Sequence, residues 1–92
     1  MKVTVEYFAQ ARAAAGLVRE IVEVPAPCTA QALVARLARD RGNRLAALLL
    51  TEDGQLSGSV LLAVGERQVF SNEPLALSDG DEVLVMPAVS GG

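Results

Sequence analysis

The residues with the clearest chemical use stand at the end of the sequence, where the chain closes on Gly91 and Gly92 a few residues after Pro87. Glycine has no Cβ, so two terminal glycines make a narrow end that suits insertion into a slot of another protein. Fully extended, residues 88–92 would reach roughly 16 Å. Chain ends are also commonly frayed without any function, and that alternative stays open here. We predict a folded domain over residues 1–87 and a flexible C-terminal tail over residues 88–92.

The segment before this tail has the composition of a β-strand. Glu82–Met86 is rich in residues that fit a pleated sheet, and a proline directly after it ends strand pairing. If Val83 and Val85 face the core, the residues between and after them face outward, where apolar side chains often mark protein contacts. We therefore expect a partner-binding surface made of Leu84, Met86, Gln68 and Pro87. Leu84 is alternatively covered within its own domain, because scattered surface leucines are ordinary.

Composition limits the other kinds of chemistry. The 92 residues predict one domain, and a net charge of -3 gives no basic stripe for a nucleic-acid backbone. The sequence has no histidine, and its one cysteine, Cys28, is most simply a small half-buried residue, so a metal site and histidine catalysis are not expected. No segment is apolar enough to cross a membrane, and the N-terminus has the pattern of a strand rather than of a signal sequence. We expect a cytoplasmic protein that contacts neither nucleic acid nor membrane.

The first half of the chain predicts two strands and a helical turn. Lys2–Phe8 alternates apolar and polar residues with the period of a half-buried strand, and Leu17–Val24 is rich in β-branched residues and ends at a proline. These two segments are expected to form a hairpin. Between them, the alanines of residues 8–16 favour a helical turn that Gly16 can close in the left-handed conformation.

One long helix is predicted after the second strand. Thr29 is a suitable N-cap, and the apolar residues that follow recur on a single helical face. That face consists of Ala30, Leu33, Val34, Leu37 and Ala38. Gly42 and Asn43 are expected to end the helix. The short apolar run Leu45–Leu50 fits either a helical turn or a strand, and we favour the helical turn.

The remaining pattern is a second hairpin and the final strand. Val60–Val64 and Arg67–Phe70 are separated by a two-residue turn, and the tight turn Ser78–Asp81 precedes the last strand. The order strand, strand, helix, strand, strand, strand is α+β, with one main helix across one face of a mixed sheet of about five strands. Hairpins at both ends of this order favour the β-grasp arrangement, in which the first and last strands are adjacent and parallel. The tail would then leave from the middle of the sheet.

The sequence resembles the MoaD family, the small subunits of molybdopterin synthase, over its whole length. The resemblance is carried by Phe8-Ala9-Gln10-Ala11-Arg12, by the stretch around Asp79–Val83, and by the terminal residues Pro87–Gly92. It implies a ubiquitin-like β-grasp domain that carries sulfur as a thiocarboxylate on its last glycine, Gly92, at the end of a tail that includes Val89, Ser90 and Gly91. It also implies two partners, an E1-like adenylating enzyme and the large synthase subunit.

The chemistry of a chain end agrees with this resemblance. A plain carboxylate is both a poor electrophile and a poor nucleophile, so it must first be activated, and adenylation by an ATP-using partner is a reasonable route. We therefore expect that the domain binds no cofactor, that ATP is used by the activating enzyme, and that the domain is not catalytic alone. Two alternatives stay open: a sulfur carrier for thiazole, tRNA thiolation or cysteine synthesis, and a ubiquitin-like protein modifier. Lys2, the only lysine, leaves little scope for chains of modifiers.

Overall fold

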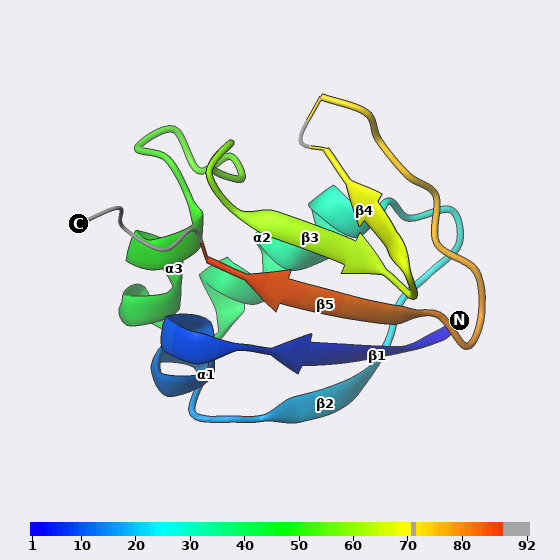
Figure 1. Cartoon of the computed structure of the whole chain (residues 1–92), viewed down its shortest axis with the longest axis horizontal. Coiled ribbons are helices and arrows are strands. Elements are labelled where there is room, and N and C mark those ends of the chain that lie inside the picture. The colour runs from blue at the N-terminus through cyan, green and yellow to red at the C-terminus, as the bar shows by residue number, and fades with distance from the viewer. Residues whose placement is uncertain (71, 88–92) are drawn as a thin grey trace.

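The five strands form one mixed sheet, and its order confirms the predicted α+β, β-grasp fold. A computed structural model describes residues 1–70 and 72–87. Its elements in chain order are β1 (Lys2–Tyr7), α1 (Ala9–Ala15), β2 (Arg19–Glu23), α2 (Ala30–Asp40), α3 (Asn43–Leu49), β3 (Leu61–Val64), β4 (Arg67–Val69) and β5 (Glu82–Met86). The strand order is β2-β1-β5-β3-β4, in which β1 and β5 are parallel and the other pairs antiparallel. Figure 1 shows β5 in the middle of the sheet with α2 behind it.

The core lies between the sheet and α2. Val3, Val5 and Tyr7 of β1 are buried at alternate positions, as are Val83 and Val85 of β5. The predicted apolar face of α2 is buried over its whole length, and Thr29 caps this helix by accepting a hydrogen bond from the backbone N–H of Ala32 at 3.1 Å. Both sequence patterns, the period of two and the period of 3.6, therefore predicted the side that faces the core.

The helix ends follow the glycines, with one correction. Gly16 closes α1 with φ of 75°, and its N–H donates to the carbonyl of Arg12, as predicted. α2 ends at Asp40 with Arg41 as its C-cap, directly before Gly42, whose φ is 112°. Gly42 is the N-cap of α3 and Asn43 its first residue, so these two residues begin the next helix rather than end α2. The physical reason lies in Leu45 and Leu49, which are one helical turn apart and both fully buried. The prediction of a helical turn over Leu45–Leu50 is confirmed.

A tight turn brings the last strand alongside the first. Gly80, with φ of 87°, donates its N–H to the carbonyl of Lys2 at 2.8 Å. The backbone N–H of Lys2 in turn donates to Asp79 Oδ1 at 2.7 Å, and Asp81 Oδ2 accepts from the backbone N–H of Ser78. These contacts fix the start of β5 against the start of β1, which explains why a strand so late in the sequence occupies the centre of the sheet.

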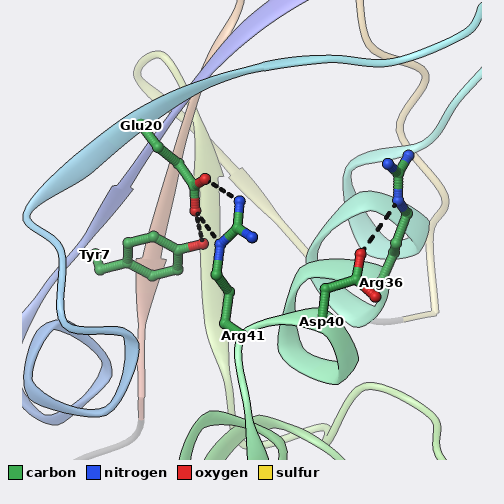
Figure 2. Close-up of polar contacts among 5 residues, drawn as sticks. All are labelled: Tyr7, Glu20, Arg36, Asp40 and Arg41. Atoms are coloured by element: carbon green, nitrogen blue, oxygen red, sulfur yellow. Dashed lines mark hydrogen bonds and ion pairs between the residues drawn. The ribbon is translucent and has the colours of Figure 1, made fainter.

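A polar cluster joins the edge of the sheet to the end of α2 (Figure 2). The Tyr7 hydroxyl donates to Glu20 Oε2 at 2.7 Å, and the guanidinium of Arg41 binds both oxygens of the same carboxylate. Burial of the phenol raises the pKa of Tyr7 well above its usual range, and the hydrogen bond to Glu20 adds to that effect. Partial burial opposes ionisation of Glu20, but the hydrogen bonds from Arg41 and Tyr7 outweigh it and lower the pKa of this carboxyl. Arg36 and Asp40 form a separate, exposed pair along α2.

We expect this cluster to make stability depend on pH. Because the pKa of Glu20 is lower in the folded chain, its contribution is present at neutral pH and is lost as the pH falls through that lowered pKa. Glu20→Gln should therefore lower the free energy of unfolding by about 1 kcal/mol at pH 7 and by much less near pH 3. Urea melts of both proteins at the two pH values measure this difference. A penalty of equal size at both would show that the charge of Glu20 is not what stabilises the contact.

Candidate functional site

The predicted chemical centre lies outside the described residues. Gly92 and the tail residues Val89, Ser90 and Gly91 belong to residues 88–92, and the structure describes the strand that leads to them. β5 is flanked by β1 on one side and β3 on the other, so the chain runs toward its end along the middle of the sheet. This confirms the predicted central position of the last strand. The division into a domain over residues 1–87 and a tail over residues 88–92 stays a prediction.

Strand register places three of the predicted partner-binding residues on the outer face of the sheet, the face away from α2. Leu84 pairs with Ala63, and Ala63 pairs with Gln68, so Leu84 and Gln68 lie in one row across three strands. Met86 lies two residues further along β5 on the same face. Leu84 and Met86 are half-buried and Gln68 is exposed, whereas Pro87 is buried and offers a partner the least surface of the four. Partner binding by these residues stays a prediction.

A second row on this face is more apolar, and sequence reasoning missed most of it. Met86 pairs with Leu61, which is 46% exposed. Continuing the register that pairs Leu62 with Val69 places Phe70, which is 52% exposed, beside Leu61. On the other side of β5, the backbone N–H of Phe8 donates to the carbonyl of Val85, so Phe8 extends β1 next to Met86. We call this set the apolar row: Phe8, Met86, Leu61 and Phe70.

The missed members had only weak sequence signals. Leu61 stands inside the run Val60–Val64, in which every residue is apolar, so alternation cannot separate its outer face from its inner one. Phe8 and Phe70 lie directly beyond the ends of their strands. For Phe8 a signal existed, because Tyr7 faces the core and the next residue of an extended chain faces the other way.

One end of the apolar row carries a positive charge. The guanidinium of Arg12 lies over the ring of Phe8, 5.7 Å from its centroid, and its Nε donates to the carbonyl of Tyr7 at 3.1 Å. A cation over an aromatic face is held by the electrons of the ring, so Arg12 has a fixed place beside the row. The arrangement provides an apolar contact surface with a cation at its rim, which a protein partner can use for binding and orientation.

Over residues 1–70 and 72–87, no helix is long and apolar enough to span a bilayer, and no three side chains of the metal-binding types gather. Cys28 packs against the core with its Sγ 3.5 Å from the carbonyl of Thr29, and it is half-buried, as predicted. The sheet face is thus the best candidate for a binding surface in this part of the chain.

Comparison with known proteins assigns the family. A sequence model of the ThiS family matches residues 5–92, nearly the whole chain and including its last residue. The chain belongs to the ThiS family. The family comprises ubiquitin-like sulfur carriers of the MoaD and ThiS types, which confirms the resemblance found in the sequence. Small carriers of this family are not catalytic alone and work with partner proteins.

Several solved structures resemble this member of the ThiS family, among them the following three. A Pyrococcus furiosus protein assigned as molybdopterin converting factor subunit 1 is 32% identical, with a TM-score of 0.71 and coverage of 97% of this chain and 99% of that one. CysO from Amycolatopsis orientalis, in complex with BexX, is 26% identical, with a TM-score of 0.62 and coverage of 98% and 99%. Small archaeal modifier protein 1 from Haloferax volcanii has a TM-score of 0.84 and covers both chains fully, but at 24% identity it supports the fold alone.

Proposed function

We propose that this chain is the sulfur-carrying small subunit of a molybdopterin synthase. The observation that carries the proposal is the ThiS-family match up to Gly92, the residue that would hold the thiocarboxylate. Support for the pterin pathway comes from the Pyrococcus furiosus relative, at 32% identity over nearly the whole chain. We also propose that the protein acts in the cytoplasm.

The proposed chemistry takes place on the terminal carboxylate of Gly92. In an E1-like partner, this carboxylate attacks the α-phosphate of ATP, forming an acyl adenylate and releasing pyrophosphate. A sulfide equivalent from a sulfur donor then attacks the acyl carbon, and AMP leaves. The sulfur of the resulting thiocarboxylate then attacks the pterin precursor, cyclic pyranopterin monophosphate, bound in the large synthase subunit. Water cleaves the acyl–sulfur bond, which leaves the sulfur on the precursor and returns Gly92 to a plain carboxylate. This chain carries the sulfur, whereas the activating enzyme uses ATP and the partners supply the active sites.

The folded domain has an energetic role in this scheme. Ordering the five residues 88–92 in a slot costs roughly 1 to 2 kcal/mol per residue, or about 5 to 10 kcal/mol in total. Docking of the apolar row would offset that cost, because burying exposed side chains such as Leu61 and Phe70 contributes roughly 25 cal/mol per Å² of apolar surface. Met86 is the last residue of β5, so a partner seated on this row would also be next to the start of the tail.

Two measurements test the proposal. Incubation of the full chain with an E1-like adenylating enzyme, ATP and a sulfur donor should replace one C-terminal oxygen with sulfur, detected by intact-protein mass spectrometry. Copurification from the native cells should then recover a large molybdopterin synthase subunit. Thiocarboxylate formation with a different sulfur-accepting enzyme would assign the carrier to another pathway. Attachment of Gly92 to lysines of other proteins, without sulfur transfer, would make the chain a protein modifier.

We expect the apolar row to determine partner affinity. Leu61→Asp or Met86→Asp should weaken binding of the large subunit by about 30-fold or more, because each places an unpaired charge at an apolar contact. Leu61 is the safer position for the fold, since it is the more exposed of the two. Ala32→Asp, on the exposed side of α2, is the matched control and should bind as wild type does. Calorimetry measures the three affinities, and equal values would exclude this row as the docking surface.

A further inference from the structure

The sheet has a free edge at β2 that the carrier chemistry does not use. β2 pairs only with β1 within the described residues, and Figure 1 shows no element beyond it. Ile21, at the centre of this strand, is 70% exposed, the largest exposure among the large apolar side chains of the described chain. An edge strand with unpaired backbone groups is a template for pairing with another strand.

The pairing with β1 determines which backbone groups of β2 are free. Tyr7 donates its N–H to the carbonyl of Val18, and Val24 exchanges hydrogen bonds with Met1. Because bonded and non-bonded pairs alternate in an antiparallel ladder, the even-numbered residues of β2 face β1. The N–H and C=O groups of Arg19, Ile21 and Glu23 therefore point to the open edge.

The charged side chains of β2 are complementary to those of a second copy of β2 in one antiparallel register. With Ile21 opposite Ile21 of a second copy, Arg19 lies opposite the second copy's Glu23, and Glu23 opposite the second copy's Arg19. This register uses all three free residues and forms about six backbone hydrogen bonds. If this register shifted by two residues, Arg19 of one copy would no longer lie opposite Glu23 of the other. We propose that β2 is a homodimer interface, in which two copies join their sheets edge to edge about a two-fold axis at Ile21.

The neighbouring strand extends the charge complementarity. Glu6 pairs with Arg19 across β1 and β2, with 3.1 Å between Oε1 and Nη2, and Lys2 pairs with Glu23. In the dimer each row across the interface would read Glu6, Arg19, then Glu23 and Lys2 of the second copy, so that charges alternate in sign. Opposite charges directly across strands stabilise a sheet, whereas like charges destabilise it.

The inner face of the interface carries no uncompensated charge. Glu20 would lie opposite Val22 of the second copy, and the carboxylate of Glu20 is already neutralised by Arg41 of its own chain. Pro25 lies at the next position that would point outward, and because it has no N–H, the ladder ends there. The dimer uses β2 alone, while β1 separates it from β5, so the apolar row stays available to a partner.

An interface of one short strand per copy is small, which predicts a weak dimer that forms as concentration rises. Sedimentation velocity of the full chain from about 10 μM to about 1 mM should show a monomer–dimer equilibrium. Glu23→Arg and Arg19→Glu should each weaken it by about tenfold or more, because each places two like-charge pairs across the axis. Glu66→Arg and Arg44→Glu make the same charge changes at exposed sites away from β2 and should dimerise as wild type does.

The two β2 variants, Glu23→Arg and Arg19→Glu, also allow a test in which dimerisation is restored by mixing them. When Glu23→Arg is mixed with Arg19→Glu, both cross-axis pairs are again arginine with glutamate, so a 1:1 heterodimer should form at concentrations where each variant alone is monomeric. Circular dichroism melts verify that both variants are folded. Amide hydrogen exchange at Ile21 should slow in the wild type as dimer forms. A wild type that stays monomeric at about 1 mM, or a mixture that gives no heterodimer, would overturn the proposal.

Discussion

Deletion of Gly92 should abolish sulfur transfer and leave the stability of the domain at the wild-type value. The sheet and the buried core of the described chain lie within residues 1–87, so the deletion removes no strand of that sheet and no residue of that core. The deletion does remove the carboxylate position that the activating enzyme and the synthase would read. Appending one residue after Gly92 should have the same effect, because it moves the carboxylate and adds a side chain at the narrowest point of the tail.

A milder variant tests the shape of the tail without changing its length. Gly91→Ala adds one Cβ and restricts the backbone, so it should slow thiocarboxylate formation without abolishing it. Intact-protein mass spectrometry after incubation with the activating enzyme, ATP and a sulfur donor measures the products, and thermal melts measure stability. If the chain without Gly92 gained sulfur and supported synthesis as wild type does, the carrier hypothesis would be wrong.

The sequence determined the fold in most respects because its local signals agree with one another. The alternation in Lys2–Phe8, the Thr29 cap and the glycine at position 16 each predicted an element that the structure contains. The parallel pairing of β1 with β5 could not be predicted from local signals of this kind. It joins residues near the two ends of the chain, and no local pattern specifies a partner strand. That pairing was predicted only by matching the element order to a known arrangement.

The candidate site was less accessible to sequence reasoning. Alternation identified Leu84 and Met86, since β5 has one clear inner set of residues. It could not identify Leu61, whose neighbours are also apolar, because only the register with β5 distinguishes the two faces of β3. The role proposed for Gly92 rests on the resemblance of the whole chain. Two terminal glycines by themselves do not distinguish a sulfur carrier from a frayed end.

Leu37→Ala should lower the free energy of unfolding by roughly 2 to 5 kcal/mol, a large share of the stability expected for a domain of this size. Leu37 lies on the buried face of α2 and is 4% exposed, so truncation to alanine leaves a cavity in the core cluster. The cost includes the lost burial of the side chain and the contacts that its neighbours lose when they cannot close the gap.

Arg39→Ala is the matched control for this helix. Arg39 is exposed two residues further along α2, and its guanidinium makes one long hydrogen bond of 3.3 Å to the carbonyl of Gly54. Because an exposed hydrogen bond exchanges readily with water, its loss should change stability by no more than about 0.5 kcal/mol. Urea melts of both variants measure the difference, and a spectroscopic signature of the native fold should persist in each. Equal stability of the two would mean that α2 does not pack on the sheet through the face containing Leu37.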